Sequence, residues 1–514
     1  MLKLDNITIT HFSGGRVLVD SLSCQIAAGD KIAIIGEEGT GKSTLLRAIA
    51  GQLDVDSFEM SGNVFQTGTT GYLPQEPPPL FLEQDTVSYL LKENPQDTID
   101  LEKYELLVDV SRLLPVVGFD SKAFSETKKL KYYSGGEKVK LSLLKLLLTH
   151  PDNLLLDEPT NDLDLPTIEF LLDFIRKEKR PLIFVSHDEY LLRRAASGII
   201  HLEQLKKRTE AHTVFAHVPY EIYRQERLKQ RRKDLEIGLK QRSEYAQKME
   251  KFRQIYSKVE YRQNQAVRNP AEARLLKKKI HVLKAEEKRL EKNRESFIEL
   301  PEPDEFIDAF FAEDVSLPRS KIVFAIDNLI LRTDRKVLAE NICFELRGPE
   351  HVAIIGANGV GKSTFLRYLY SLTRTRTDLK FAYMPQEYSE VLNFDQPAFE
   401  FLQTEPTNAE EARVRRMMGA LLFETDEMVA PIGRLSGGQK AKLLLLKLIL
   451  DRPDVLLLDE PTRNLSPLNS PEVFRMIDQF KGAVIAVTHD REFLDSSFRK
   501  VYRLTPVGFQ LERE

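Results

Sequence analysis

The chain has 514 residues, of which 42% are hydrophobic and 30% charged, and its formal net charge is −4. This is a globular composition for about two to four domains, which excludes a disordered chain. No run approaches the roughly 18 to 20 consecutive apolar residues of a membrane-spanning helix, and residues 1–6 lack the layout of a secretory signal. The two cysteines, Cys24 and Cys343, cannot form a disulfide framework or a four-ligand metal site. We therefore expect a cytoplasmic protein with no membrane part.

In the first half, an apolar run at 31–35 predicts a buried strand, and a helical pattern begins at residue 45. Between them lies a P-loop, Gly-x-x-x-x-Gly-Lys-Ser. Its glycines let backbone N–H groups surround phosphates, its lysine meets the β and γ phosphates, and its serine hydroxyl reaches Mg²⁺. The residues expected to bind ATP and Mg²⁺ here are Gly36, Gly39, Gly41, Lys42, Ser43 and Thr44.

Further along, two apolar strands end in polar side chains. The strand at 154–156 precedes Asp157 and Glu158, and the strand at 182–185 precedes His187. The carboxyl ends of parallel strands are where an α/β sheet places its ligand site. Asp157 suits coordination of Mg²⁺ through water, and Glu158 suits polarisation of the water that attacks the γ-phosphate. The alternative is an acidic pair at a helix cap.

Positive charge is concentrated between the two halves. Residues 221–300 hold 23 Lys and Arg against 13 Asp and Glu, a net charge of +10, so the rest of the chain carries −14. An acidic body with a basic segment suggests contact with a polyanion, and a solvated pair of charged helices is the alternative.

The same segment has apolar residues at helical spacing. A first helix of some 40 residues, roughly 60 Å long, begins near residue 220, and a second is expected to start at Asn269-Pro270 with Glu272 in the capping box. We predict that they pack as an antiparallel hairpin. The two apolar stripes are Leu228, Leu235, Leu239, Ala246, Met249, Phe252 and Tyr256 on the first helix, and Ile280, Leu283, Leu290 and Phe297 on the second.

The second half repeats the motifs of the first in the same order. The serine of Ser-Gly-Gly precedes the strand-end aspartate by 23 positions in both halves, and 29 positions separate the glutamate from the histidine in both. The chain is therefore an internal duplication. The second-half residues expected to serve nucleotide and Mg²⁺ are Gly356, Gly359, Gly361, Lys362, Ser363, Thr364, Asp459 and Glu460.

One difference lies inside the P-loops. The first has Glu37 and Glu38 where the second has Ala357 and Asn358. Two carboxylates facing the nucleotide would weaken its binding. We expect them to point to solvent or to the opposite half.

Ser-Gly-Gly-Glu ahead of the Asp-Glu-Pro strand resembles the signature of the ABC ATPases. In that family two cassettes close head to tail, and each ATP lies between the P-loop of one cassette and the signature of the other, with a glutamine serving the metal and a histidine contacting the γ-phosphate. The resemblance implies a first site of Lys42, Ser43, Gln75, Asp157, Glu158 and His187 with Ser436, Gly437 and Gly438. It implies a second site of Lys362, Ser363, Gln386, Asp459, Glu460 and His489 with Ser134, Gly135 and Gly136.

The resemblance also implies unequal sites. Phe12 is placed to stack on adenine in the first half, whereas 331–335 holds no aromatic residue and offers Arg332 instead. Residues 161–164 match the D-loop of the family, but the counterpart at 463–466 loses the final carboxylate. Both glutamates are present, so we expect two hydrolytic sites with unequal rates.

Two cassettes with a basic hairpin between them resemble the ABC-F family over essentially the whole chain. This implies an α/β fold with tandem P-loop cassettes at 1–205 and 319–514 joined by a helical-hairpin linker at 206–318. It further implies a monomer that binds the 70S ribosome and contacts rRNA and tRNA, as a translation factor or in antibiotic ribosome protection. The linker-tip residues expected to meet RNA are Arg262, Gln263, Asn264, Gln265 and Arg268.

Two other functions would use the same motifs. The ATPase component of a membrane exporter would have no evident use for a long basic linker. A DNA-repair or chromosome ATPase carries its coiled coil within a cassette, whereas here the helical segment lies between two complete ones.

Overall fold

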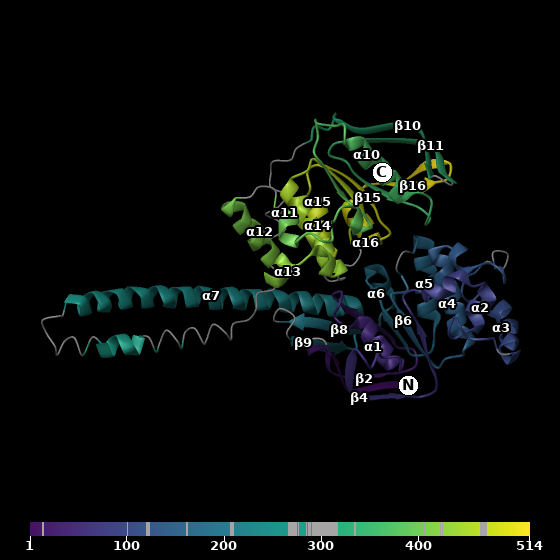
Figure 1. Ribbon diagram of the computed structural model, residues 1–514, viewed down its shortest axis with the longest axis horizontal. Helices are drawn as coiled ribbons and strands as arrows, with labels where there is room; N and C mark the ends of the chain where they lie inside the picture. Colours follow the sequence, from purple (N-terminus) through teal and green to yellow (C-terminus); the bar gives the residue numbers. More distant parts are fainter. Residues whose placement is uncertain are drawn as a thin grey trace. The chain divides into compact units, whose positions relative to one another are not determined.

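A computed structural model describes residues 1–12, 15–99, 101–119, 124–160, 163–205, 210–265, 275, 277–283, 285, 289, 317–333, 336–403, 407–421, 423, 425–462 and 470–513 (Figure 1). The chain forms two compact units. One comprises Met1–Tyr223 with Asp304–Glu514 and holds both cassettes, and the other is Arg224–Pro303, here called the linker unit.

Each cassette is built on a six-stranded sheet of the same topology, which confirms the α/β fold and the duplication. In the first the strand order is β5 (Thr70–Leu73), β6 (Asn153–Asp157), β7 (Leu182–Val185), β3 (Lys31–Gly36), β8 (Gly198–Leu205) and β9 (Glu210–Ala216). In the second it is β13 (Phe381–Met384), β14 (Val455–Asp459), β15 (Ala483–Val487), β12 (His351–Ile355), β16 (Lys500–Thr505) and β17 (Gly508–Arg513). Only the last strand of each sheet runs antiparallel.

A smaller antiparallel sheet accompanies each large one. In the first cassette it has the order β2 (Arg16–Ile26), β1 (Leu2–His11) and β4 (Phe58–Gln66), and in the second it pairs β10 (Ile322–Thr333) with β11 (Lys336–Arg347). The helices of the first cassette are α1 (Lys42–Ile49), α2 (Thr86–Leu91), α3 (Leu106–Leu113), α4 (Gly135–Leu148), α5 (Leu165–Lys177) and α6 (Glu189–Ala195). Those of the second are α10 (Lys362–Thr373), α11 (Ala398–Leu402), α12 (Asn408–Ala420), α13 (Thr425–Val429), α14 (Gly437–Asp451), α15 (Ser470–Asp478) and α16 (Arg491–Ser497).

The central strands are continuous apolar runs because both faces of each sheet are covered. On β3, Ile32 and Ile34 belong to one buried cluster, whereas Ala33 and Ile35 belong to the cluster on the opposite face. Such runs are typical of parallel strands buried on both sides. The strand ends that carry the polar motifs are therefore held at one edge of a rigid core.

The region after β8 still belongs to the first cassette. The linker was expected to begin at residue 206, but β9 pairs with β8 in antiparallel register from Leu205–Glu210 to Ile199–Ala216. At the far side, Leu317 packs in the core of the second cassette with Val323 and Leu346. The linker bounds were expected from the change in composition along the sequence, and composition does not reveal strand pairing or core packing.

The linker unit contains most of α7 (Tyr220–Gln265), a 46-residue helix, which at 1.5 Å per residue is about 69 Å long. Phe252, Val259 and Leu283 are buried together, with Met249, Tyr256 and Ile280 packed against them. These contacts confirm the central part of the two predicted stripes and add Val259 to it. Leu228 was wrongly placed in the stripe, because its side chain is 43% exposed.

Several linker predictions lie outside the described residues. They include the cap at 269–272, Leu290 and Phe297, and the side chains of Leu235, Leu239 and Ala246. Of the predicted tip, Arg262 is exposed on the last turns of α7, the side chains of Gln263, Asn264 and Gln265 are not described, and Arg268 lies beyond the described part.

Candidate functional site

Both P-loops have the backbone shape that their glycines permit. Gly36, Gly39 and Gly41 have φ values of 152°, 76° and 99°, and the corresponding glycines of the second loop have 152°, 76° and 110°. L-residues with a side chain rarely adopt such values. A Cβ at Gly36 would also lie 2.4 Å from the Leu202 carbonyl oxygen. The loops therefore keep their N–H groups free of side-chain bulk, as phosphate binding requires.

The P-loop lysines lie buried within their own loops. Lys42 Nζ donates to the carbonyl oxygens of Gly36 and Glu37, both at 3.0 Å. Lys362 Nζ makes the same pair of bonds in the second loop. Burial lowers the pKa of Lys42, an effect that Glu158 opposes most strongly. Each loop thus holds a lysine Nζ where phosphates are expected.

At the first site, the residues expected to bind Mg²⁺ are linked by hydrogen bonds. Ser43 Oγ donates to Asp157 Oδ1 at 2.9 Å, and the Tyr72 hydroxyl donates to Asp157 Oδ2 at 2.9 Å. Arg47 Nε lies 3.5 Å from the Tyr72 oxygen. Burial raises the pKa of Asp157, against these two hydrogen bonds. A hydroxyl beside a carboxylate is an all-oxygen ligand set that fits Mg²⁺.

At the second site the equivalent carboxylate lacks those bonds. Asp459 is 1% exposed, and neither oxygen accepts a hydrogen bond from the described residues. The Tyr383 hydroxyl beside it also has no such partner. Burial raises the pKa of Asp459 to about 6, and the Ser363 hydroxyl, although short of a full hydrogen bond, opposes that rise. A buried carboxylate without donors is costly, so this residue fits a bound cation.

The strand-end glutamates occupy an unusual backbone conformation. Glu158 and Glu460 have φ values of 45° and 51°, in the left-handed region. Their backbone N–H groups bond to the carbonyls of Val185 and Val487 at 3.1 and 2.9 Å. Non-glycine residues held in this region occur preferentially at functional sites. This backbone conformation, which the motif alone did not reveal, supports the role expected for both glutamates.

Pairing of neighbouring strands brings glutamate and histidine together. Asp157 lies opposite Val185 in the β6–β7 register, so the residues after these strand ends meet. His187 Nε2 is 3.4 Å from Glu158 Oε1, and Gln75 Nε2 donates to Glu158 Oε2 at 3.4 Å. The three predicted residues of the first site therefore form one cluster.

The second site repeats this cluster with looser geometry. His489 Nε2 is 3.9 Å from Glu460 Oε1, and its Nδ1 has no hydrogen bond from the described residues. Burial lowers the pKa of His489 to about 3, with Lys362 as the next cause. Burial, with the neighbouring Asp459, raises the pKa of Glu460. His489 is thus neutral at physiological pH.

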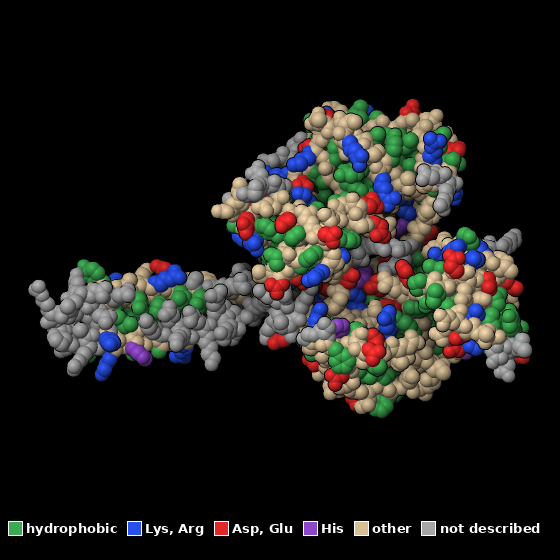
Figure 2. Space-filling model, in the orientation of Figure 1, with side chains coloured by type: hydrophobic (Ala, Val, Ile, Leu, Met, Phe, Trp, Pro, Cys, Tyr) green, Lys and Arg blue, Asp and Glu red, His purple; other side chains and the backbone are tan. Residues whose placement is uncertain are grey.

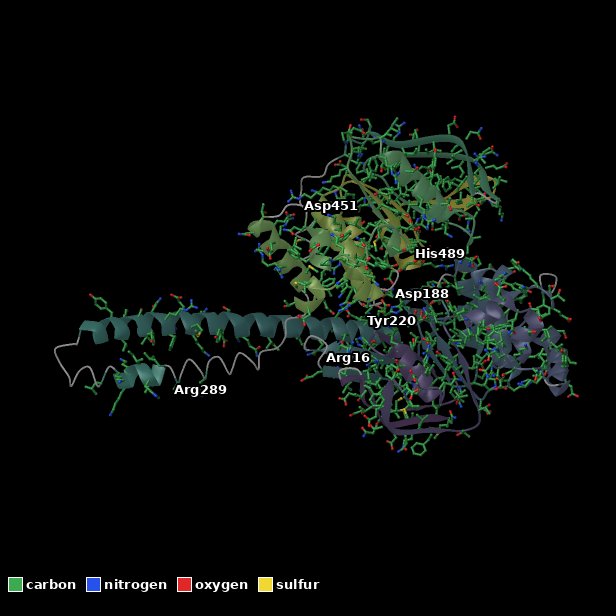
Figure 3. The ribbon with its side chains drawn as sticks, viewed as in Figure 1. Arg16, Asp188, Tyr220, Arg289, Asp451 and His489 are labelled. Atoms are coloured by element: carbon green, nitrogen blue, oxygen red, sulfur yellow. The ribbon has the colours of Figure 1, made fainter. Side chains whose placement is uncertain are left out.

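A cavity of about 490 Å³ surrounds the second P-loop, a typical size for a small-molecule site. Both cassettes line it, and Asp188 and His489 lie at its wall (Figure 3). The second cassette contributes Thr333, Leu338, Asn358, Gly359, Gly361, Lys362, Ser363, Thr364, Gln386, Asp459, Glu460, Thr462, Val487, His489 and Asp490. The first contributes Thr160, Leu163, Ile168, His187 and Asp188, whereas Ser134, Gly135 and Gly136 are not among the described lining residues.

The signature serines cap the helices that follow them. Ser134 and Glu137 form a capping box at the start of α4, and Ser436 and Gln439 form one at α14. The second signature reaches the first P-loop, because Gly438 N donates to Glu38 Oε2 at 2.5 Å. The structure thus brings a signature to the opposite P-loop at the first site.

The predicted adenine and D-loop residues are placed only in part. Phe12 is 55% exposed at the end of β1, which leaves its ring accessible. Arg332 is exposed and is not a described lining residue of the cavity, whereas its neighbour Thr333 is. Asp164 caps α5 through Thr167 N, and Asn161, Asp162 and 463–466 lie outside the described residues.

Sequence reasoning missed the tyrosines that accompany the strand-end aspartates. Tyr72 and Tyr383 each stand three positions before the glutamine of the Pro-Gln motif. Arg47 lies near the first, and its counterpart Arg367, which also lies near Tyr383, pairs with Glu390 through bonds of 2.6 to 3.1 Å. A tyrosine repeated at the same offset in both halves was a usable signal.

The profile of the family described as ABC transporter matches the chain twice, over residues 19–161 and 339–463, which together exceed half its length. This chain belongs to that family. Among the described residues, no helix combines the length and apolar character needed to cross a membrane.

Three known proteins are similar to this chain over most of its length. The putative ATP-binding protein YdiF of Bacillus subtilis is 29% identical, over 98% of this chain and 80% of the relative. The ribosome protection protein VmlR of the same organism is 28% identical, over 96% of this chain and 85% of the relative. The solved archaeal ribosome recycling factor aABCE1, in complex with stalk protein aP1, has a TM-score of 0.60 at 15% identity and covers 99% and 90% of the two chains, which shows a shared fold.

The two segments matched by the family model confirm a tandem ABC ATPase, and the ABC-F resemblance is supported by ABC transporter F family member 5 of Arabidopsis thaliana, 27% identical over 97% of this chain and 74% of the relative. ATP is therefore its nucleotide substrate.

Proposed function

We propose that this ABC ATPase binds the ribosome in its ATP-closed state, directs its linker toward tRNA and the peptidyl-transferase centre, and leaves after ATP hydrolysis. The observation that carries the proposal is the long basic helix α7 between two complete cassettes. Lys and Arg side chains are visible along the described part of the linker unit (Figure 2). The relative VmlR is a ribosome protection protein by name, which supports the same client.

Basic side chains on α7 suit contact with RNA phosphates. Arg253, Lys258 and Arg262 are exposed on the helix, and Tyr261, beside Arg262, is 65% exposed. Phosphate contacts dominate the affinity of nucleic-acid binding, and aromatic rings stack on unpaired bases. The protein would then act as a translation factor or in antibiotic ribosome protection, as a monomer whose cassettes pair within one chain.

Hydrolysis at the first site would depend on positioning and electrostatics. Lys42 would hold the phosphates, Ser43 and Asp157 would hold Mg²⁺, and Glu158 would orient and polarise the attacking water. When bound, Mg²⁺ neutralises phosphate charge. His187, 3.4 Å from Glu158, is placed to contact the γ-phosphate and hold the glutamate. The counterparts in the second half take the same roles.

Closure would be coupled to the γ-phosphate through the signatures. At the first site, the N–H groups that begin α14 would bind it, because a helix N-terminus favours anions. At the second site, closure requires Ser134–Gly136 to approach the second P-loop. Hydrolysis removes the shared anion, so the closed state loses its advantage and the cassettes separate.

The family description also favours a second function, the ATPase component of a membrane exporter. Such a component couples to membrane-spanning subunits, and α7 has no evident task there. The two functions predict different binding partners for the closed protein, ribosomes for the first and membranes for the second.

A double substitution tests the proposal. Glu158→Gln with Glu460→Gln removes the charge that polarises water and keeps the shape, so hydrolysis is expected to fall at least about a hundredfold while ATP-driven closure persists. We expect this variant to sediment with 70S ribosomes from lysate in the presence of ATP.

Lys42→Ala with Lys362→Ala is the matched control, because it removes phosphate binding and is expected to stay in the unbound fraction. Sedimentation of the Gln variant with membranes, free of ribosomes, would favour the exporter function and rule out the proposed one.

A further inference from the structure

The two acidic residues of the first P-loop both contact the second cassette. Glu38 Oε2 accepts a hydrogen bond from Gly438 N at 2.5 Å. Glu37 Oε1 lies 3.4 Å from Lys442 Nζ, one turn further along α14. This outcome matches the expectation that these side chains point to the opposite cassette.

The signature has room for a carboxylate because it lacks a side chain there. A Cβ on Gly437 would lie 2.6 Å from Glu38 Oε2 and 3.0 Å from Oε1. A side chain at this position would displace the Glu38 carboxylate, so the glycine leaves the space that the carboxylate occupies. The carboxylate and the first turn of α14 therefore fit each other closely.

The backbone N–H that Glu38 occupies belongs to the groups that are expected to bind a phosphate. The N-terminus of α14 presents backbone N–H groups and the positive end of a 15-residue helix. A carboxylate and a γ-phosphate are both anions that such a terminus attracts. The same N–H of Gly438 cannot serve both at full strength. Glu38 and the γ-phosphate therefore compete.

The second P-loop has no such competitor. Ala357 and Asn358 replace the two glutamates, and neither carries a charge. Asn358 lines the cavity of the second site, in which the first signature takes no described part. The competition is thus a property of one site only.

We propose that Glu38 is an internal stand-in for the γ-phosphate, which holds the second signature at the first P-loop until ATP displaces it. The inference rests on the proposed role of the signature in binding the γ-phosphate. Glu38 thereby determines how strongly the first site distinguishes ATP from ADP. With ADP bound, the carboxylate keeps the signature, whereas ATP must replace a bond that is already made.

Amide hydrogen exchange in the nucleotide-free full chain tests the contact. In Glu38→Ala, we expect the amides that begin α14 to exchange about tenfold faster, the effect of losing one hydrogen bond to a charged group. The equivalent amides of α4 serve as the internal reference. Asn358→Ala, at the matching position of the second loop, is expected to change neither.

Nucleotide preference tests the consequence. With the second site disabled by Lys362→Ala and turnover stopped by Glu158→Gln, fluorescent ATP and ADP analogues report binding at the first site. Removal of Glu38 is expected to raise the ratio of ATP to ADP affinity roughly tenfold. Glu38→Gln, which keeps the shape and loses the charge, is expected to give a similar change.

The outcomes separate this inference from the proposed function. Unchanged exchange at α14 in Glu38→Ala would overturn the inference, whatever the ribosome assay shows. Faster exchange with an unchanged ATP to ADP ratio would also overturn it, because the signature would then not compete with the γ-phosphate. If both expected changes occur but the protein does not sediment with ribosomes, the inference is supported and only the ribosome function is rejected.

Discussion

At the scale of single residues, the two sites share their motifs but differ in the hydrogen bonds of the aspartate that would hold Mg²⁺. Asp157 accepts hydrogen bonds from Ser43 and Tyr72, whereas both oxygens of Asp459 lack a partner among the described residues. At the second site Glu390 binds Arg367, which also lies near Tyr383. Preorganised ligands hold a metal in one geometry, so the first site is expected to bind Mg²⁺ more tightly.

Tyr72→Phe removes the hydroxyl that orients Asp157, and we expect Mg²⁺ affinity at the first site to fall about three- to tenfold. Tyr383→Phe should change the second site little, because its hydroxyl makes no described bond to Asp459. Mn²⁺ binding with ATP, followed by electron paramagnetic resonance with the other site disabled, measures both. Equal losses in the two variants would contradict the assigned roles.

At the scale of elements, helices α6 and α16 meet through charged side chains. Arg193 binds Glu492 at 2.7 Å, and Arg491 binds the Tyr190 hydroxyl at 2.8 Å. Asp490 caps the N-terminus of α16. Burial, Asp188 and then Glu492 raise its pKa to about 7, while hydrogen bonds from the backbone N–H groups of α16 oppose the rise. A carboxyl whose pKa is raised by folding binds more protons when folded. The contribution of this carboxyl to stability is therefore fully present below about pH 4 and is lost as the pH rises through about 7.

Asp490→Asn keeps a good helix cap and removes the charge. We expect it to raise the Tm of the unfolding transition of the cassettes at pH 8 by a few degrees. A change of about 1 kcal/mol shifts Tm by roughly 2–4 °C in domains of this size. At pH 4 the gain should disappear, because the wild-type carboxyl is then protonated. Asp85→Asn, at the cap of α2, is the matched control. A gain that is equal at both pH values would contradict this account.

At the scale of the whole molecule, each cassette supplies a rigid sheet, and the linker supplies a long charged helix. The packing of Phe252, Val259 and Leu283 shows that the linker unit has a small core of its own. Because this packing supports the helix, its basic side chains form a fixed surface. This arrangement suits contact with a structured polyanion such as ribosomal RNA.

Lys258→Glu with Arg262→Glu, made in the Glu158→Gln and Glu460→Gln background, should weaken ribosome sedimentation by tenfold or more. It should also flatten the dependence on salt, because each phosphate contact contributes about 0.7 to 0.9 to the slope of log K against log salt concentration. Arg374→Glu, an exposed change on the second cassette, is the control. Unaltered binding and salt dependence would show that the linker does not contact RNA.

The sequence by itself determined the duplication, the strand-loop-helix units and the residues at the strand ends. These features are local, since an apolar run and a glycine pattern specify a strand and a P-loop without help from distant residues. Only the tertiary structure decided what depends on long-range contacts. Strand β9 joins the first sheet, Glu158 and Glu460 adopt a left-handed backbone, and Arg367 turns to Glu390. Glu38 occupies the signature of the opposite cassette because residues 400 positions apart meet only in the folded chain.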